Sequence, residues 1–278
     1  MARVAVFGAG SVGSAIAHRL AERSRVDDVL LIDDAPAVAA GKALDIRQSG
    51  PISRADTSVD ATADPLAAVG AAAIVLADDT VSGFWDGDRG LRLIERLMRA
   101  GASGPFVFAG PSQIALLETV VRELHLPADR IVATSASAVE SIARSLVAIE
   151  LGETGAAVTL TGRPPQCVVA WAAATIGGTL VSERVAPHRL LAISQALPRF
   201  WPPGPQAVAA ATVPAIEALI AGSRRLIPAV TMLDGELGVR GRAGLMPVEL
   251  GHGRVLRRVP PSLTPQERTE AVSSLLRD

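Results

Sequence analysis

The residues best placed to do chemistry form a glycine-rich turn near the start of the chain. Gly8, Gly10 and Gly13 follow a short apolar run, and a second apolar run ends on Asp33, twenty positions beyond Gly13. Glycines at this spacing permit a tight turn, let a pyrophosphate approach the backbone and let the following helix pack close to the strand. The free amides and the positive end of that helix favour a diphosphate anion. The pattern therefore predicts a strand, a turn, a helix and a second strand that together bind a dinucleotide.

Asp33 is the residue expected to select the cofactor. Its carboxylate is suited to accept hydrogen bonds from the adenosine ribose hydroxyls and would repel a 2′-phosphate. No basic residue occurs between Asp33 and Lys42 to compensate, so NAD is favoured over NADP. A glycine turn that binds no ligand is the alternative. The residues predicted to bind the cofactor are Gly8, Gly10, Ser11, Val12, Gly13, Asp33, Ala77 and Gly110.

The composition of the whole chain argues against several classes of protein. At 278 residues the chain suits two lobes that share a cleft, and 49% hydrophobic with 20% charged residues indicates a globular protein. The single cysteine, Cys167, excludes an internal disulfide and a multi-cysteine metal site, so we expect no metal. A net charge of −1 and the absence of Lys/Arg blocks argue against nucleic acid binding.

We also expect a cytoplasmic protein that does not enter a membrane. No apolar run reaches the roughly 18 residues that a membrane-spanning helix needs. The chain enters a predicted strand within its first residues, which leaves no room for a signal peptide.

Apolar runs alternate with helical patterns through the first half of the chain. This alternation predicts a parallel sheet with right-handed crossovers. Gly50-Pro51 is predicted to end the second helix, and residues 78–88 are predicted to form a loop. The predicted strands are residues 4–7, 29–32, 57–61, 72–77, 106–109 and 131–133. The predicted helices are residues 37–48, 89–100 and 113–124, with one ending near residue 23 and a short one ending near residue 70.

The second half of the chain is predicted to mix helices with short strands. A helix over residues 139–151 leads out of the first lobe, and residues 168–175 fit no single pattern. Thr264-Pro265 with Glu267 predicts the start of the last helix. The other predicted elements are strands at residues 156–161, 226–232, around 239 and 247–249, joined by glycine-rich turns, and helices at residues 190–197 and 213–220.

Further motifs are spread over nearly the whole chain. They are residues 30–33 (LLID), 41–46 (GKALDI), 126–131 (LPADRI), 228–230 (PAV), 235–239 (GELGV), 245–251 (LMPVELG) and 263–268 (LTPQER). With the glycine turn, these motifs resemble the NAD-dependent malate/lactate dehydrogenase family. The resemblance implies a Rossmann-type parallel-sheet domain at residues 1–136 and an α+β domain of the lactate/malate dehydrogenase type at residues 137–278. It also implies an oxidoreductase-like protein that binds NAD, takes a small carboxylate-type substrate and forms a homodimer or homotetramer.

The catalytic residues of that family are replaced at the matching positions. In the family a histidine takes the hydroxyl proton, an aspartate orients the histidine, and two arginines hold and polarise the substrate. The resemblance puts the histidine at Pro164, the aspartate at Glu140 and the carboxylate-binding arginine at Ala143. The second arginine falls on Gly90, and the asparagine near the nicotinamide falls on Gly110. Proline has no proton to exchange and alanine cannot bind a carboxylate, so the standard set is missing.

Three hypotheses about function follow. The first is an NAD(H)-binding pseudoenzyme with a degenerate catalytic site, not a standard malate or lactate dehydrogenase. The second is an active NAD-dependent oxidoreductase on a 2-hydroxy acid or related alcohol, with a relocated site in which Glu140 is the base. Its anion contacts would be Arg89, Arg144 or Arg163. The third is a structural subunit that binds no nucleotide.

Asp78 and Asp79 follow the fourth predicted strand, close to where a pyrophosphate would lie. A carboxylate about 4 Å from a phosphate costs on the order of 1 kcal/mol in water and 4 kcal/mol at a partly buried site. Either both side chains point to solvent, or the cofactor site has decayed or takes a less anionic ligand. The nearby Trp85 would cover a ligand or pack on a neighbouring subunit. None of the four histidines is an obvious substitute for the missing base: His18, His125, His188 and His252.

Overall fold

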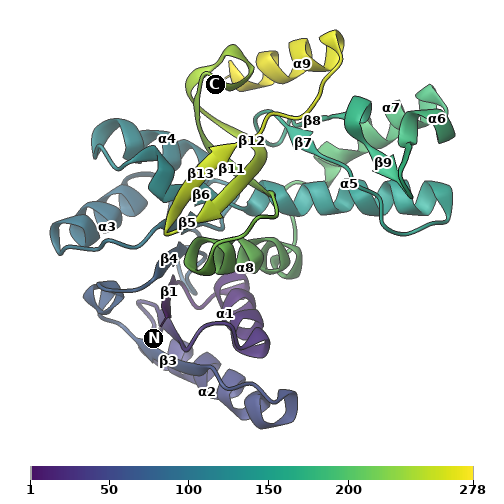
Figure 1. The fold of residues 1–278 in the computed structure, drawn as a ribbon. Helices are drawn as coiled ribbons and strands as arrows, with labels where there is room; N and C mark the ends of the chain where they lie inside the picture. The colour runs from purple at the N-terminus through teal and green to yellow at the C-terminus, as the bar shows by residue number, and fades with distance from the viewer. Residues whose placement is uncertain (1, 278) are drawn as a thin grey trace.

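A computed structural model describes residues 2–277 as one wide sheet flanked by helices, with a second group of helices at one side (Figure 1). The sheet has nine strands in the order β13-β12-β11-β6-β5-β4-β1-β2-β3. Its parallel part, read 3-2-1-4-5-6, has the strand order of the doubly wound dinucleotide-binding fold. The parallel strands are β1 (Arg3–Phe7), β2 (Asp28–Ile32), β3 (Ser58–Thr62), β4 (Ala73–Leu76), β5 (Phe106–Phe108) and β6 (Ile131–Ala133).

Helices cover both faces of the parallel strands. Along β1, Val4 and Val6 pack with apolar residues of α1, α2 and the later helix α8 (Pro205–Ala221), whereas Ala5 and Phe7 pack with those of α3 and α4. Successive side chains of a strand point to opposite faces, so this run has to be apolar throughout. The helices of this half are α1 (Ser11–Arg23), α2 (Pro36–Ser53), α3 (Gly87–Arg99) and α4 (Gln113–Glu123), with 3-10 turns η1 (Pro65–Ala68) and η2 (Ala128–Arg130).

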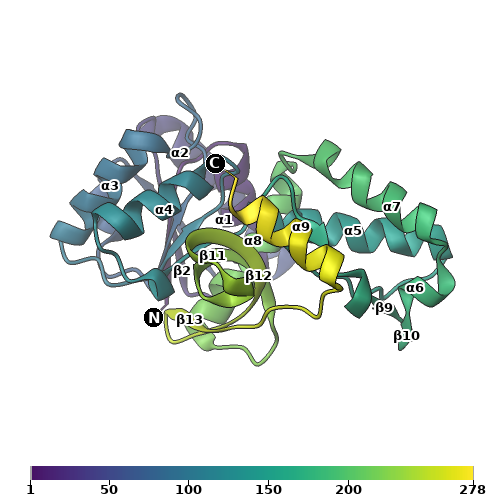
Figure 2. The same cartoon turned by 90° about the horizontal axis from the view of Figure 1, so that it is seen from above.

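The second half leaves the sheet and then returns to it. Helix α5 (Ser135–Leu151) leads away, and both views show α6 (Val181–Arg184) and α7 (Pro187–Ala196) near its far end (Figures 1 and 2). Strand β11 (Ile227–Asp234) comes back antiparallel to β6, with Val230 opposite Ala133, and β12 and β13 extend the sheet. The predicted architecture, a Rossmann-type sheet followed by an α+β half, is confirmed.

The remaining elements of this half are strands, 3-10 turns and helices of various lengths. They are β7 (Leu160–Thr161), β8 (Val168–Val169), η3 (Trp171–Ala173), β9 (Thr175–Ile176), β10 (Thr179–Leu180), α6 (Val181–Arg184), α7 (Pro187–Ala196), η4 (Leu197–Phe200), α8 (Pro205–Ala221), η5 (Glu236–Gly238), β12 (Arg240–Gly251), β13 (Arg254–Arg258) and α9 (Pro265–Leu275). Helix α9 begins with the capping box expected of Thr264 and Glu267, in which each residue bonds the other's backbone N–H.

Helix α2 runs past its predicted end at Gly50-Pro51. It ends at Ser53, where Arg54 adopts a left-handed conformation (φ +57°) and the Ala55 N–H donates to the Gly50 carbonyl oxygen at 2.9 Å. A proline disfavours helical conformation in the preceding residue partly through contact with that residue's Cβ. Gly50 has no Cβ, so the proline is tolerated in the last turn.

Strand β12 is longer than the short strands predicted near Val239 and at residues 247–249. It runs without interruption over Arg240–Gly251. Its glycines were interpreted as turns, but Gly244 lies inside the strand. A Cβ on Gly244 would lie 2.5 Å from Cδ2 of Leu275 in α9. The glycine therefore makes room for the last helix.

An ion pair joins the two halves of the chain. Arg23, in the last turn of α1, donates from Nε and from a terminal nitrogen to the two oxygens of Glu217 in α8, at 2.5 and 2.8 Å. Glu217 is only 9% exposed. A bidentate pair of this kind fixes the relative orientation of its two helices.

Within residues 2–277 no single helix is both long and apolar enough to cross a membrane. One bent pair, Pro187–Phe200 with Pro205–Ala221, meets the requirement only when the two are taken together, across a bend of 97°. The same residues contain no group of three or more His, Cys, Asp or Glu side chains that could hold a metal ion.

Candidate dinucleotide site

The turn between β1 and α1 needs its glycines. Gly8 has a φ of +104°, and its N–H donates to the Ile32 carbonyl oxygen at 2.7 Å. A Cβ on Gly8 would lie 2.1 Å from the carbonyl oxygen of Asp78, and a Cβ on Gly13 would lie 1.9 Å from that of Gly8. No side chain tolerates such contacts, so both glycines permit a close backbone approach. The predicted strand, turn, helix and second strand are all present.

The carboxylate of Asp78 lies at the amino end of α1. Its Oδ1 accepts hydrogen bonds from the backbone N–H groups of Val12 and Gly13, both at 2.8 Å. Its Oδ2 accepts one from the Ser11 hydroxyl at 2.9 Å. A Cβ on Gly10 would lie 2.6 Å from Asp78 Cγ. Amides at a helix start are the groups that bind a diphosphate in this fold, and here a side chain of the same chain uses them.

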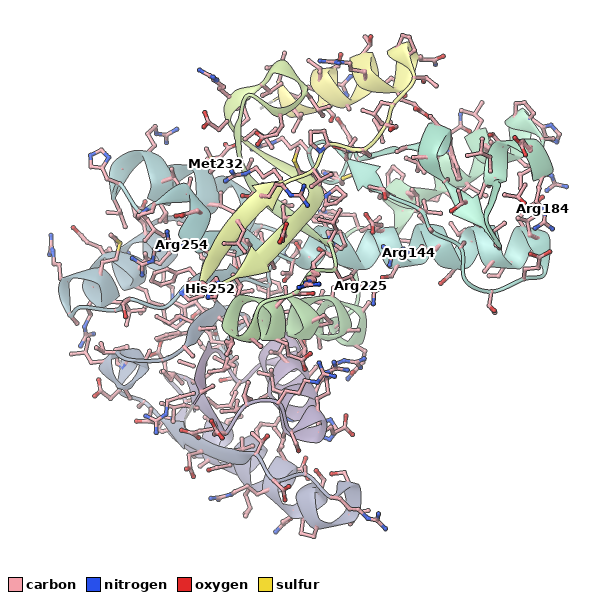
Figure 3. The ribbon with its side chains drawn as sticks, viewed as in Figure 1. Arg144, Arg184, Arg225, Met232, His252 and Arg254 are labelled. Atoms are coloured by element: carbon pink, nitrogen blue, oxygen red, sulfur yellow. The ribbon has the colours of Figure 1, made fainter. Side chains whose placement is uncertain are left out.

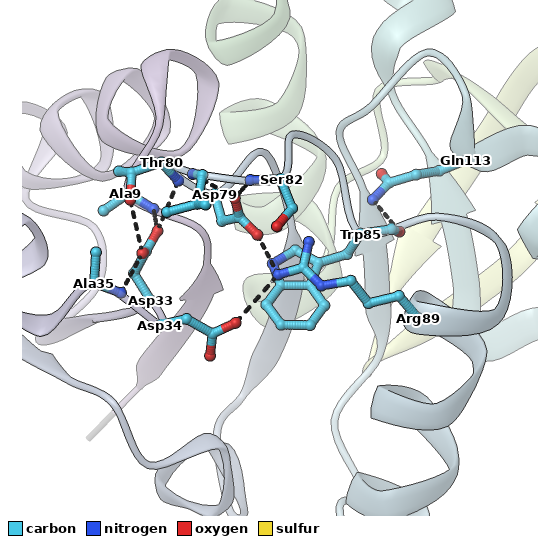
Figure 4. Close-up of polar contacts among 11 residues, drawn as sticks. Ala9, Asp33, Asp34, Ala35, Asp79, Thr80, Ser82, Trp85, Arg89 and Gln113 are labelled. Atoms are coloured by element: carbon cyan, nitrogen blue, oxygen red, sulfur yellow. Dashed lines mark hydrogen bonds and ion pairs between the residues drawn. The ribbon is translucent and has the colours of Figure 1, made fainter.

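Asp33, at the end of β2, faces the same loop (Figure 4). The residue is only 1% exposed. Its Oδ2 accepts hydrogen bonds from the N–H groups of Ala9 at 2.8 Å and Thr80 at 3.2 Å. Its Oδ1 accepts from the Ala35 N–H at 2.8 Å and the Thr80 hydroxyl at 3.0 Å. The predicted ribose-binding acid thus uses both oxygens within the protein.

Asp79 fixes the loop from the other side and is 6% exposed. It accepts hydrogen bonds from the N–H groups of Val81 and Ser82 and pairs with Arg89. Burial alone would raise the pKa of Asp79, but the amides of Ser82 and Val81 and the Arg89 guanidinium together hold that pKa below its ordinary value. The interpretation in which Asp78 and Asp79 both point to solvent is therefore wrong.

Trp85 packs inside the chain. It is 8% exposed, and its ring meets that of Phe7 edge-on at a centroid distance of 6.0 Å. The Arg89 guanidinium lies 3.6 Å above the Trp85 ring and also reaches Asp34 at 3.3 Å (Figure 4). A cavity of about 200 Å³ lies beside these side chains and Asp33. Arg89, a predicted anion contact, is thus held by an aromatic ring and two carboxylates of its own chain.

Phe84 fills the space beside Gly110. A Cβ on Gly110 would lie 2.5 Å from Phe84 Cδ1 and 3.0 Å from Gln113 Cδ. The fully buried Gln113 accepts a hydrogen bond from the Gly110 N–H at 2.7 Å and donates one to the Trp85 carbonyl oxygen at 2.8 Å. The position that resembles the family's asparagine therefore has no room for a side chain.

Glu140 is buried near the start of α5, with 2% of its surface exposed. One oxygen pairs with Arg144, one turn further along the helix, and the other accepts a hydrogen bond from the Leu160 N–H at 3.0 Å. Burial raises the pKa of Glu140 above its ordinary value, although Arg144 and the Leu160 amide oppose this. Both carboxylate oxygens are therefore engaged.

The predicted catalytic residues do not meet in one place. Arg163 donates to both oxygens of Glu118, in a pair whose side chains are 15% and 12% exposed. Glu140 and Arg144 contact each other, but Arg163 and Arg89 bind other carboxylates in other parts of the fold. Each of these arginines has a partner within the chain.

The positions that resemble the family's proton carrier and arginines hold buried, inert residues. Pro164 and Ala143 are both buried. Gly90 lies within α3, where a Cβ would come within 2.5 Å of Leu116 Cδ2 and 2.8 Å of the Trp85 carbonyl oxygen. An arginine at Gly90 would have to displace this packing.

The four histidines and the cysteine of the described structure are not placed as a general base. His18, His125, His188 and His252 are all exposed. His252 lies in the turn after β12, on a different part of the molecule from Arg144 of α5 (Figure 3). Burial, with a smaller contribution from the charge of Glu140, raises the pKa of the Cys167 thiol above its ordinary value, so this thiol stays protonated and inert.

Three residues that complete this site were missed by sequence analysis: Thr80, Phe84 and Gln113. Thr80 and Phe84 stand in a loop without periodicity, where sequence gives no side-chain direction. Gln113 was interpreted only as the start of a helix. Its position three residues after Gly110 is the available signal, because an amide side chain at that spacing can bond the N–H of the preceding turn.

The fold and the glycine turn define a Rossmann-type dinucleotide-binding α/β protein. Residues 2–79 match the family model described as lactate/malate dehydrogenase, NAD binding domain. Malate dehydrogenase from Staphylococcus carnosus is 29% identical over 291 residues, covering 96% of this chain and 93% of that protein. Malate dehydrogenase from Chlorobium phaeobacteroides is 24% identical over 287 residues, covering 95% and 92%.

Solved structures have the same fold over the whole chain. A minor L-lactate dehydrogenase from Enterococcus mundtii, in a ligand-bound form, matches with a TM-score of 0.88 and 21% identity, covering 98% of this chain and 95% of that one. Malate dehydrogenase from Salinibacter ruber matches with a TM-score of 0.86 and 22% identity, covering 98% and 93%. The chain is thus similar to lactate and malate dehydrogenases over nearly its whole length, and residues 2–79 match their NAD-binding domain, so the cofactor of its first half is NAD.

The site fits NAD in its glycines and its acid. Gly8 and Gly10 permit the close approach of a diphosphate, and Asp33 stands where a ribose-binding acid is needed. Two side chains of the loop after β4 lie across these groups. Asp78 accepts hydrogen bonds from the amides at the start of α1, and Thr80 donates hydrogen bonds to the carboxylate of Asp33.

Proposed function

We propose that this chain is an NAD(H)-binding member of its family with a degenerate catalytic site, a pseudoenzyme for the family's standard reaction. The observation that carries this proposal is the buried Pro164 at the position that resembles the catalytic histidine. A proline ring has no proton to exchange. A positioned general base contributes roughly 10²–10⁴-fold to a rate, so its loss alone makes ordinary malate or lactate dehydrogenase turnover untenable.

The residues that would grip a substrate carboxylate support the same proposal. Ala143 offers no charge, and the packing around Gly90 leaves no space for a side chain. The neighbouring arginines form ion pairs with carboxylates of their own chain, so none is a ready replacement: Arg89, Arg144 and Arg163. Losing several groups of one mechanism removes that mechanism, although the individual losses do not add.

The proposed cofactor site runs along the carboxyl ends of β1, β2, β4 and β5, where ligands bind in open α/β sheets. NAD, when bound, would supply hydride transfer, and the chain would supply binding and orientation. Asp33 would hold the adenosine ribose once Thr80 releases it. The residues proposed to hold the cofactor are Gly8, Gly10, Ser11, Val12, Gly13, Asp33, Ala77 and Gly110.

An active oxidoreductase with a relocated site is the second candidate. The observation in its favour is the raised pKa of the buried Glu140, because perturbed pKa values gather at functional sites. Glu140 would have to leave Arg144 before it could take a proton. Buried structural ion pairs also perturb pKa values, which is why this candidate stands second.

Two assays on the purified protein separate these candidates. Isothermal titration with NADH measures binding, and a screen of 2-hydroxy and 2-oxo acids with NAD(H) measures turnover. We expect binding without turnover. Turnover that is lost in Glu140→Gln but kept in His18→Ala would establish the relocated site instead. No heat of binding at millimolar NADH would favour a structural subunit that binds no nucleotide.

We further propose a cytoplasmic homodimer or homotetramer with domains at residues 1–136 and 137–278. Exposed apolar side chains on α2 support an assembly, since Val38, Leu44 and Ile52 are 44%, 47% and 88% exposed. Light scattering on a gel-filtration column tests the assembly. A monomer at micromolar concentration would contradict it.

A further inference from the structure

We propose that residues 78–84, here called the plug loop, close the NAD site of this chain and must swing out before the cofactor can bind. Asp78 then acts as a built-in competitor of the cofactor's diphosphate. The inference rests on the proposed NAD(H) binding and adds its regulation: the affinity for NAD(H) is set by how often the plug loop is open.

The first contact of the plug loop is with the diphosphate-binding amides. The Asp78 carboxylate accepts hydrogen bonds from the N–H groups of Val12 and Gly13 and from the Ser11 hydroxyl, all within 2.9 Å. A carboxylate and a phosphate carry the same sign of charge and need the same donors. Because Asp78 Cγ lies 2.6 Å from the Cβ position of Gly10, no ligand atom fits between the carboxyl group and the backbone. The two anions exclude each other.

The second contact is with the ribose-binding acid. Thr80 donates its N–H and its hydroxyl to the two oxygens of Asp33, which also accept N–H groups from Ala9 and Ala35. An ionised carboxylate has about four acceptor sites, and all four are filled. Ribose hydroxyls can bond Asp33 only after Thr80 leaves.

The third contact is at the nicotinamide end of the family's site. The Phe84 ring lies 2.5 Å from the Cβ position of Gly110, so it fills the space that a side chain there would take. One loop thus reaches three subsites of a single dinucleotide, through Asp78, Thr80 and Phe84. Contacts at all three subsites are expected of a loop that occupies the place of the cofactor, and not of an ordinary surface loop.

The plug loop has backbone hydrogen bonds within it and glycines that could act as hinges. Asp79 and Gly83 share a backbone hydrogen bond at 2.8 Å, and Asp78 and Phe84 form an isolated β-bridge, whereas the Asp79 pair with Arg89 of α3 is a further contact of the closed form. The loop is therefore a unit. Gly83 and Gly87 have positive φ angles of +84° and +49° with open space around them, which suits hinge positions. The tip of the loop buries little, since Val81 is 79% exposed.

The consequence for affinity can be stated quantitatively. A ligand that binds only the open form has an apparent dissociation constant equal to the intrinsic one divided by the open fraction. An open fraction of about 1% would weaken NADH binding about 100-fold. Removing the Asp78 carboxylate takes away three hydrogen bonds of the closed form without touching a group that the cofactor needs.

The test compares NADH affinity in wild type and in Asp78→Ala by isothermal titration. Asp60→Ala, which removes an exposed carboxylate from β3, is the matched charge control. We expect Asp78→Ala to bind NADH at least about tenfold more tightly than wild type, with Asp60→Ala unchanged. Equal affinities in all three proteins would overturn the plug and leave NAD(H) binding intact. No binding by any of them, with folding verified by circular dichroism, would overturn the proposed function and the plug together.

A second measurement does not depend on the variant. Hydrogen exchange of wild type with and without saturating NADH reports on the Thr80 amide, whose hydrogen bond to Asp33 exists only while the loop is closed. If the plug loop leaves the site when NADH binds, the Thr80 amide should exchange faster in the presence of NADH, while the amides of β1 should exchange more slowly. Slower exchange throughout the loop would overturn the proposal. Thr80→Val serves as a further variant and should also tighten binding.

Discussion

Arg163 donates from its two terminal guanidinium nitrogens to the two carboxylate oxygens of Glu118. Glu118 also accepts a hydrogen bond from the Ala243 N–H of β12 at 2.8 Å, so this pair ties α4 to the segment before Pro164 and to the antiparallel strands. An arginine committed in this way holds the fold together. Its place next to Pro164 is therefore weak evidence for a substrate contact.

The Arg163→Ala variant should lose stability, because it leaves Glu118 largely buried with one partner fewer. Removing one member of a buried pair costs about 3 kcal/mol. Urea denaturation should show this loss, whereas Arg184→Ala, which breaks an exposed pair with Glu153, should change the stability little. Arg163 would instead be a substrate contact if Arg163→Ala kept its stability and abolished turnover.

Glu140 should make the free energy of unfolding depend on pH. Its pKa is raised in the folded protein, so the folded state holds a proton that the unfolded state has released above about pH 4.5, the ordinary value. The unfolding free energy of wild type should then fall as the pH rises from about 4.5 through the folded pKa. Glu140→Gln has no such proton, and the difference between the two proteins should vary across this window. A difference that is constant from pH 4 to pH 8 would contradict the raised pKa.

Asp79 should change the pH dependence of the unfolding free energy in the opposite direction to Glu140. Its pKa is lowered, so its contribution to stability is complete above its ordinary value of 3.8 and is lost as the pH falls through the folded pKa. Asp79→Asn should cost about 2 kcal/mol at pH 7, since it weakens the bonds to Arg89 and to two backbone amides. Guanidinium unfolding at pH 7 and pH 3 measures the cost, which should shrink at the lower pH. Asp60→Asn, at an exposed position, should change little at either pH.

The fold could be predicted from local patterns because several elements carry complete signals. The strand β4 is continuously apolar and fully buried, and the capping box of α9 can be recognised in the sequence from Thr264 and Glu267. The prediction that a glycine marks a turn or a helix end was wrong where the glycine is needed for close packing. Gly244 accommodates Leu275 from α9, and Gly50 allows Pro51 to stay in a helix. In each case the deciding contact or missing Cβ is a matter of three-dimensional space.

Only part of the candidate site, the glycines and Asp33, could be predicted from the sequence. The glycines and Asp33 follow one another closely enough for spacing to reveal them. Asp78 reaches Val12 across 66 positions of sequence, and Thr80 reaches Asp33 across 47. A loop without periodicity gives no side-chain direction, so whether an acid faces solvent or a helix end had to come from the structure.

The space beside Gly110 gives a test of packing that uses pairs of variants. Gly110→Ala should destabilise the protein by about 1–3 kcal/mol, because its Cβ would lie 2.5 Å from Phe84. Phe84→Ala removes the obstacle, so the double variant should cost less than the two single variants added together. A coupling energy of about 1 kcal/mol or more in urea denaturation is the expected result.

The matched control for this cycle is Gly41→Ala in α2, where nothing lies within 4 Å of the Cβ position. Alanine inside a helix is favoured over glycine by about 0.5–1 kcal/mol, so this variant should gain stability and show no coupling to Phe84→Ala. If Gly110 and Phe84 proved additive within error, Phe84 would not fill the space beside Gly110. The plug loop would then lose one of its three contacts, and the case for a closed site would depend on Asp78 and Thr80 alone.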